Sequence, residues 1–305
     1  MSVQRLNNTP CSESTFSVEN QGVPLKTELL DTTLDLNSPE TRKTVVFPQQ
    51  QSSERIITRL QTECEGEKAR NQHLQQTFNA MRYIKTIRPA DPVQLEAKKI
   101  VLPKRKKAKK TLVFDLDETL VHCCSNIDQA AVIIDVKMPN GEFMKCGINI
   151  RPYVHECLLA ANINYEIIVF TASHKCYADT VLDYLDPTHE LIHHRLYREN
   201  CIVTDNLFIK DLRVLDNRKI EDIIIVDNAA YSFAYQIDNG VPIISWYSDP
   251  NDKELFNLIE YLRALSTFQD IRVANRRMFH LHTFYNDYLH EFGLENKENT
   301  VIVNH

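Results

Sequence analysis

The chain has 305 residues, of which 43% are hydrophobic and 25% are charged. This length suits one large domain with a tail or two modest domains, and only six glycines and twelve prolines exclude a fibrous or low-complexity chain. The formal net charge of -6 argues against direct nucleic-acid binding. No segment has the pattern of a signal peptide or the roughly 18 apolar residues of a membrane span. We therefore expect a soluble, intracellular protein with no membrane contact.

The cysteine pattern points to a reducing compartment. The eight cysteines include no C-x-x-C pair, and the adjacent Cys123 and Cys124 suit neither a zinc site nor an ordinary disulfide. We expect all eight to be free thiols.

The first 102 residues divide into a polar tail and a helical segment. Residues 1–51 are rich in Ser, Thr, Asn and Gln and lack a sustained apolar period, so we expect them to be disordered. Residues 52–102 read as a helical segment and linker. Apolar residues recur there at intervals of three and four, which predicts a helix within 52–85: Ile56, Ile57, Leu60, Cys64, Leu74, Phe78, Met81 and Ile84. The polar interruption around Gly66 argues against a long coiled coil and leaves two interpretations, an exposed marginal helix or a helix that docks a partner protein.

Residues 103–110 form a basic run, with six cations in the seven residues from Lys104 to Lys110. Such runs stay solvated and act as nuclear-import signals or as patches that attract anions. We favour an import signal, which predicts a nuclear protein. The alternative role of the run is a solubilising linker, and the alternative location of the protein is the cytoplasm.

A short apolar run, Thr111–Phe114, has the pattern of a buried β-strand and leads directly into Asp115 and Asp117. The two acids would point the same way if the strand continued, and a turn after Asp115 would spread them around one pocket. Either geometry places both at the carboxyl end of a strand, where ligands bind in open α/β sheets. A lone Asp-x-Asp is also compatible with a solvated loop.

The rest of the chain alternates strands with helices. Met-Pro-Asn-Gly at 138–141 is a strong hairpin signal, so we expect a β-hairpin inserted into the α/β alternation. The predicted elements are strands at 131–136 and 143–148, a helix at 151–161, a strand at 165–170, a helix at 175–185, a further strand, a hairpin-like stretch at 200–209, and strands at 222–226 and 241–245.

Polar side chains follow four of the predicted strands. They are Asp115 with Asp117, Thr171, Lys210, and Asp227 with Asn228. Each has a structural explanation of its own, because Thr171 can cap a helix, Lys210 can be a surface amine, and 227–228 can be turn residues. Their recurrence at successive strand ends favours one common site.

The element Thr111–Val121, which reads TLVFDLDETLV, resembles the signature of the phosphatases that act on the C-terminal domain (CTD) of RNA polymerase II, in the haloacid-dehalogenase-like superfamily. The likeness runs from Lys110 to His282 and is greatest for the CTD small phosphatase-like, or NLI-interacting-factor-like, branch. Its other motifs lie at 168–173, 177–179, 195–199, 209–212, 225–228 and 241–247. It implies an α/β sandwich with a parallel central sheet and a small β-hairpin insert, over residues 111–290, with a C-terminal tail at 291–305.

The resemblance also implies an activity, Mg²⁺-dependent hydrolysis of phosphoserine or phosphothreonine in a protein substrate. Asp115 would attack phosphorus and form an aspartyl-phosphate, while Asp117 would serve first as general acid and then as general base. Thr171 and Lys210 would bind the phosphate.

The same resemblance implies a magnesium site. Mg²⁺ prefers oxygen ligands and keeps several waters. Asp115, the backbone of Asp117 and Asn228 would supply such oxygens, with Asp227 in support.

Four further positions match substrate-side residues of the family. Tyr177 and Arg198 are retained, whereas Ser125 and His174 stand where the best-known small polymerase phosphatases have large apolar residues that bind a proline beside the phosphoserine. A polar pocket binds that proline poorly. We therefore expect a nuclear phosphoprotein substrate, with the polymerase tail as one candidate.

Two other function classes stay open. A small-molecule phosphatase of the same fold would need a larger cap than the short insert between Cys124 and Arg151. A non-catalytic scaffold, acting through the N-terminal tail and helix, would be expected to have lost at least one of the two acids. Turnover of a generic aryl phosphate separates an enzyme from a scaffold.

Overall fold

The computed structural model describes residues 64–105, 110–289 and 291–292. The expectations for the tail at 1–51, for the first part of the helical segment, for 106–109 and for 293–305 fall outside these residues. Among the described helices, none combines the length and the apolar character that crossing a bilayer requires.

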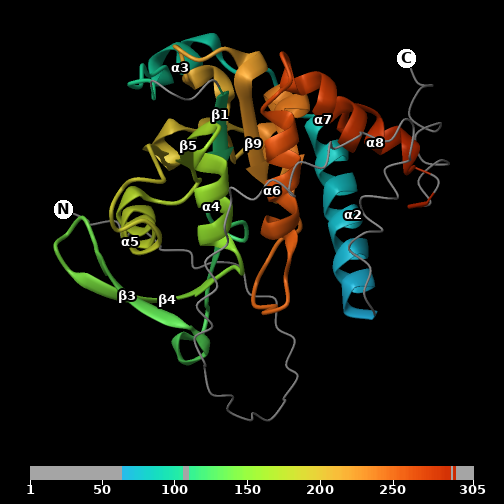
Figure 1. Ribbon diagram of the computed structural model, residues 1–305. Coiled ribbons are helices and arrows are strands. Elements are labelled where there is room, and N and C mark those ends of the chain that lie inside the picture. The colour runs from blue at the N-terminus through green and yellow to red at the C-terminus, as the bar shows by residue number, and fades with distance from the viewer. Residues whose placement is uncertain (1–63, 106–109, 290, 293–305) are drawn as a thin grey trace, which may run out of the picture. The chain divides into compact units, whose positions relative to one another are not determined.

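A five-stranded parallel sheet forms the centre of the described region, in the order β10-β9-β1-β5-β6 (Figure 1). The strands are β1 (Lys110–Phe114), β5 (Tyr165–Phe170), β6 (His194–Leu196), β9 (Ile223–Asp227) and β10 (Gly240–Pro242). The strands predicted at 111–114, 165–170 and 222–226 are thereby confirmed to within one residue.

Both faces of this sheet are buried, which explains why its strands are apolar throughout rather than alternating. In β1, Leu112 and Phe114 pack into the core on one face and Val113 into the core on the other. In β5, Ile167 and Ile168 divide in the same way.

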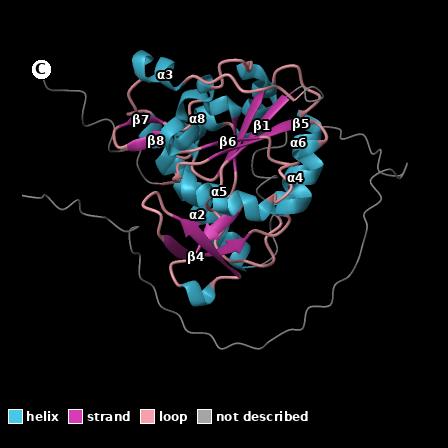
Figure 2. Ribbon diagram, turned by 90° about the vertical axis from the view of Figure 1, so that its left-hand side faces the viewer, coloured by secondary structure: helices cyan, strands magenta, loops and turns pink. Residues whose placement is uncertain are grey.

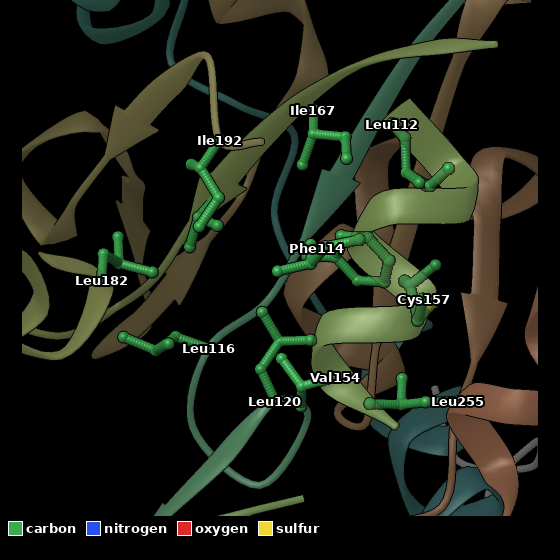
Figure 3. Packing of buried hydrophobic residues seen from close by; sticks show 14 of the residues in the cluster. Leu112, Phe114, Leu116, Leu120, Val154, Cys157, Ile167, Leu182, Ile192 and Leu255 are labelled. Atoms are coloured by element: carbon green, nitrogen blue, oxygen red, sulfur yellow. The ribbon is translucent and has the colours of Figure 1, made fainter. Parts of the chain in front are cut away.

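Helices cover each face of the sheet. The first core receives α4 (Val154–Asn162), α5 (Lys175–Leu185), α6 (Glu254–Leu265) and α7 (Ile271–Phe279). Figure 3 shows Val154 and Cys157 of α4 and Leu255 of α6 around Phe114 in this core. The second core receives α2 (Cys64–Ile84), α8 (Leu281–Asp287) and the irregular 3-10 segment η6 (Ala230–Asn239).

The helix α2 belongs to the core of this chain. Its apolar residues Leu74, Phe78 and Met81 are buried, and the Phe78 ring stacks 5.0 Å from the ring of Tyr285 in α8. The helix predicted within 52–85 is thus confirmed from Cys64 onward, and from Leu74 to Ile84 its apolar stripe packs into the core instead of being exposed or left free for a partner protein.

The predicted β-hairpin is confirmed and gains a third strand. Figure 2 shows this sheet set apart from the central strands, and its order is β2-β4-β3. The strands are β2 (Val121–Cys123), β3 (Val132–Lys137) and β4 (Phe143–Ile150). Gly141, in the turn, has φ +88°, which explains the glycine of the Asn-Gly pair. The expected α/β sandwich with a parallel central sheet and an inserted hairpin is therefore present.

Some elements differ from the predictions. The strand predicted at 241–245 ends at Pro242, because its neighbour β9 ends at Asp227 and leaves the next residues no strand to pair with. The stretch at 200–209 forms a separate two-stranded sheet of β7 (Ile202–Thr204) and β8 (Leu207–Ile209). The helices α3 (Pro92–Lys98), α6, α7 and α8 were not predicted.

The ends of the basic run are anchored to the domain rather than solvated. Lys110 is the first residue of β1, is 6% exposed, and forms an ion pair with Asp222 at 2.9 Å. The Arg105 guanidinium donates to the carbonyl oxygens of Asn162 and Tyr165. The remaining candidates for a signal are Lys104, which is exposed, and the cations within 106–109, which lie outside the described residues.

A buried carboxylate, Glu166 of β5, ties the start of β1 to neighbouring loops. It accepts two hydrogen bonds from the Arg218 guanidinium at 2.7 and 2.8 Å and one from Thr111 at 3.3 Å, and His194 lies 3.4 Å away. Burial alone would raise the pKa of Glu166, but the contacts with His194 and Arg218 hold it at about 2.

We expect Glu166→Gln to lower the free energy of unfolding at pH 7 by about 2 kcal/mol. This cost is smaller than that of removing the side chain altogether, because glutamine keeps part of the hydrogen bonding. The folded pKa of Glu166 lies below its unfolded value of 4.5, so this stabilisation is complete above pH 4.5 and is lost as the pH falls toward 2. Urea unfolding of both proteins at several pH values should show the difference shrinking on acidification. An equal difference at pH 7 and pH 3 would contradict the assignment.

Candidate active site

The carboxyl ends of three adjacent strands bring the predicted polar residues together. In the sheet, β1 lies between β9 and β5, and parallel strands end at the same edge. Asp227 is the last residue of β9, Asp115 directly follows β1, and Thr171 directly follows β5. All three are buried.

The chain turns sharply after Asp115, so the two acids diverge. The Asp115 amide donates to Val226 of β9 at 2.9 Å, which extends the sheet pairing by one residue. Glu118 then takes φ +57°, in the left-handed region, and its carbonyl accepts from the Trp246 amide at 2.9 Å. Of the two geometries considered from the sequence, the turn is the one adopted.

The Asp115 carboxylate is held by a lysine and a hydroxyl. Lys210 Nζ lies 2.5 Å from Asp115 Oδ1 and 2.6 Å from Asp227 Oδ2, while Thr119 Oγ1 donates to Asp115 Oδ2 at 3.0 Å. Lys210 follows β8, outside the central sheet, and its amide donates to the Ser232 carbonyl at 2.6 Å. The ammonium thus bridges two acids from neighbouring strands.

Negative charge at this edge exceeds positive charge. Three carboxylates, those of Asp115, Asp117 and Asp227, surround the single ammonium of Lys210. The pKa of Asp115 is raised to about 7, mainly by burial. Lys210 lowers this pKa, and repulsion from Asp227 and Asp117 raises it again in part. Attraction to Asp115 and Asp227 raises the pKa of Lys210 despite its burial. A further cation would stabilise this arrangement.

The oxygens at this position suit a hard divalent cation. Thr119 Oγ1 lies within 3.0 Å of Asp115 Oδ2 and 3.4 Å of Asn228 Oδ1, so both oxygens face the same space. Within the described residues no cluster of three or more His, Cys, Asp or Glu side chains has metal-binding geometry. The predicted set fits that finding, because it contains one carboxylate, one amide and a main-chain carbonyl and relies on waters, as Mg²⁺ does.

The second acid, Asp117, faces the opposite wall. Its carboxylate accepts from the hydroxyls of Ser173 at 2.6 Å, Tyr177 at 2.8 Å and Thr171 at 3.3 Å. Burial raises the pKa of Asp117, and the hydrogen bonds from Ser173 and Tyr177 oppose the shift. Because these hydroxyls occupy its carboxylate, Asp117 would reach a metal only through its backbone carbonyl.

A cavity of about 300 Å³ opens over these groups. Its walls include Asp115, Asp117, Thr171, Lys210, Asp227 and Asn228, together with residues that the sequence did not single out: Glu118, Ala172, Asn206, Leu207, Phe208, Ala229, Tyr231 and Ser232. The catalytic, phosphate-binding and metal residues predicted from the sequence thus share one cavity.

None of the four substrate-side residues lines this cavity. His174 is exposed, and its Nε2 lies 3.0 Å from the Arg198 guanidinium, which in turn stacks 4.9 Å from the Phe208 ring at the cavity wall. Tyr177 holds Asp117, and Ser125 is exposed in the loop after β2. His174 and Arg198 thus form a pair beside the cavity.

Several hydroxyl residues that complete the site were missed. Thr119 and Ser173 bind the two acids, Ser232 donates to Asp227 at 2.6 Å, and Ser245 accepts from Asn228 at 2.9 Å. Ser173 stands three residues beyond the strand predicted at 165–170, and Ser245 is the last residue of the strand predicted at 241–245. Their position near strand ends was the available signal in the sequence. Serine is common in loops and turns, so its residue type alone does not indicate a functional site.

The parallel α/β sheet, the inserted small sheet and the acid-lysine cavity at its carboxyl edge define a protein of the haloacid-dehalogenase-like class. Residues 110–272 match the model for the NLI interacting factor-like phosphatases. That match covers more than half of the chain, so the chain belongs to this family, as the resemblance predicted.

Curated relatives are consistent with this membership. The chain is 39% identical over 173 residues to CTD small phosphatase-like protein 3 of Caenorhabditis elegans, an alignment that covers 56% of this chain and 60% of the relative. It is 36% identical over 210 residues to CTD small phosphatase-like protein 2 of Dictyostelium discoideum, an alignment that covers 67% of this chain and 36% of the relative. It is 33% identical over 189 residues to CTD nuclear envelope phosphatase 1 of Xenopus tropicalis, covering 57% and 74%.

The alignments to the first two relatives thus span less than two thirds of their lengths. Among solved structures, Fcp1, an essential RNA polymerase II CTD phosphatase, is similar with a TM-score of 0.40 and 17% identity over 67% of this chain and 69% of that one.

Proposed function

We propose that this protein is a Mg²⁺-dependent serine/threonine phosphatase of phosphoproteins that works through a phosphorylated Asp115. The observation that carries the proposal is the pairing of Asp115 with Lys210 at 2.5 Å, with Asp117 on the facing wall of the same cavity. A nucleophile, a fixed positive charge and a separate acid are the groups that a two-step phosphoryl transfer requires.

In the first step, an Asp115 oxygen attacks phosphorus and the bond from phosphorus to the serine or threonine oxygen breaks. Asp117 gives its proton to that oxygen, and its raised pKa favours the protonated form that this requires. Lys210 neutralises negative charge on the transferred group, and Thr171 donates a hydrogen bond to a non-bridging phosphate oxygen.

In the second step, Asp117 removes a proton from water, the water oxygen attacks phosphorus, and the bond to Asp115 breaks to release inorganic phosphate. A Mg²⁺ ion held by Asp115, the Asp117 carbonyl and Asn228 would supply the further positive charge that the phosphate dianion and the acidic site need. Asp227 supports this site by holding Lys210.

A protein substrate suits the site better than a small metabolite. Between β2 and α4 the chain adds only a three-stranded sheet and a short 3-10 turn, so the described residues contain no cap large enough to enclose a small molecule. Retention of both acids, each held by hydrogen bonds, argues against a scaffold that has lost catalysis.

We expect Asp115→Asn to reduce hydrolysis of an aryl phosphate by at least about a thousandfold, because a neutral amide neither attacks phosphorus nor binds Mg²⁺ comparably. Native turnover should stop on chelation and return with added Mg²⁺. The matched control is Asp135→Asn on the exposed face of β3, which should keep native rates. The assignment fails if Asp115→Asn, shown to be folded by circular dichroism, retains more than a few per cent of the activity.

Ser125 and His174, the polar residues that stand at the family's proline-binding positions, predict weak selection for proline. Burial of a proline ring against apolar side chains contributes about 1 to 2 kcal/mol, a roughly five- to thirtyfold preference. The native protein should hydrolyse matched phosphoserine-proline and phosphoserine-alanine peptides at similar kcat/KM. The double variant Ser125→Phe with His174→Leu should favour the proline peptide several-fold at an unchanged aryl phosphate rate. A strong proline preference in the native protein would show that other residues build the pocket.

Nuclear localisation is part of the proposal, supported by the basic run and by a relative whose name places it at the nuclear envelope. Because Arg105 and Lys110 pack on the domain, the test replaces only the remaining cations with glutamine: Lys104, Lys106, Lys107 and Lys109. This variant should move to the cytoplasm with unchanged turnover. Continued nuclear accumulation of the variant, or a native protein found only in the cytoplasm, would refute the import signal.

A further inference from the structure

The helix α2 lies outside the part of the chain that matches the family, yet its residue Gln76 contacts Ser245, which binds Asn228 of the candidate site. One stripe of α2 is apolar and packs against α8. A second stripe, at three-residue intervals, is polar and consists of Arg70, His73 and Gln76. The packing against α8 explains the first stripe but not the second.

His73 and Gln76 lie close to the loops that carry the catalytic residues. Burial, together with the positive charge of Arg151, lowers the pKa of His73 to about 4. Arg151 is 1% exposed and donates to the main-chain carbonyl of Thr119 at 3.1 Å, and Thr119 binds Asp115. The charge that acts on His73 therefore belongs to a residue that supports the catalytic loop.

Gln76 continues a directed chain of hydrogen bonds that begins at Asn228. The Asn228 amide nitrogen, which can only donate, gives a hydrogen bond to Ser245 Oγ at 2.9 Å. The Ser245 hydroxyl has one hydrogen, and it points to Gln76 Oε1 at 3.4 Å, a long contact. Because these hydrogen bonds hold the nitrogen of the Asn228 amide, its oxygen Oδ1 lies on the opposite side, toward Thr119 and Asp115.

The direction of this chain decides which atom of the Asn228 side chain faces the cavity. An amide that flips would present its NH₂ group, which cannot bind a cation, in place of its oxygen. A serine hydroxyl alone fixes this orientation poorly, because it can rotate and donate elsewhere. An acceptor fixed on a packed helix holds that hydroxyl as an acceptor for Asn228.

We propose that Gln76 is a positioning residue, which acts through Ser245 to hold the Asn228 amide with its oxygen toward the metal. This inference rests on the proposed function for the identity of the metal site. It assigns a role in that site to a helix that precedes the family domain, so the domain alone would bind the metal more weakly than the chain that includes α2.

The test compares metal binding in the full chain with Gln76→Leu, which keeps size but loses the acceptor. Mn²⁺ binding, followed by the electron paramagnetic resonance signal of the free ion, should weaken by about three- to tenfold, at the low end of the cost of losing an outer-shell partner. The Mg²⁺ concentration for half-maximal aryl phosphate hydrolysis should rise by a similar factor, while kcat at saturating Mg²⁺ changes less.

Four further variants separate positioning from a general effect on the helix. Gln75→Leu makes the same replacement at the exposed neighbour and should bind Mn²⁺ like the native protein. Gln76→Glu keeps an accepting oxygen and should bind close to native. Ser245→Ala should weaken binding at least as much as Gln76→Leu, and the double variant should be no weaker than Ser245→Ala alone, because both act on one chain of bonds.

Native Mn²⁺ affinity in folded Gln76→Leu, or additive effects of the two changes, would overturn the inference. If Gln76→Leu fails to fold, Gln76→Glu and Ser245→Ala still decide: native affinity in Ser245→Ala would overturn it. A native protein that binds Mn²⁺ but hydrolyses no phosphate would instead refute the proposed function, while the binding comparison would still test the role of Gln76.

Discussion

The buried bridge between Lys210 and the carboxylates of Asp115 and Asp227 is the constraint on which the site depends. Removal of one partner from a buried ion pair costs about 3 to 5 kcal/mol, because it leaves an uncompensated charge away from water. The bridge also requires that β1 and β9 be neighbours and that the loop after β8 cross to them. The same contacts that hold the loop in place therefore keep a nucleophile, a cation and a supporting acid in one position.

The parallel sheet supplies the geometry that such a bridge needs. Since both faces of β1, β5 and β9 are buried, the strands cannot shift in register without exposing apolar residues, and their ends stay aligned. The chain turns directly after Asp115, so that Asp115 faces Lys210 and Asp117 faces the hydroxyls of Ser173 and Tyr177. Two identical side chains acquire different surroundings, which is the basis for giving them different roles.

Much of this arrangement could be predicted from the sequence because it follows from local pattern. The continuous apolar runs gave the positions of β1, β5 and β9, and charged or hydroxyl residues at their ends marked the cavity. What local pattern does not contain is long-range packing. The burial of α2 against α8, the anchoring of Lys110 by Asp222, and the hydrogen bonds of Ser173 and Ser245 all join segments far apart in the chain. The strand predicted at 241–245 was too long for the same reason, since its end is set by the length of β9.

The central claim is that phosphate passes through Asp115, and the most direct measurement is the mass of the peptide that contains it. Asp117→Asn should slow hydrolysis of the intermediate, because the group that activates water is lost. After brief incubation with substrate and Mg²⁺ and an acid quench, this variant should carry a single phosphoryl group on Asp115. Turnover by the native protein without any phosphoryl group on Asp115 in this variant, or a phosphoryl group on another residue, would contradict the account.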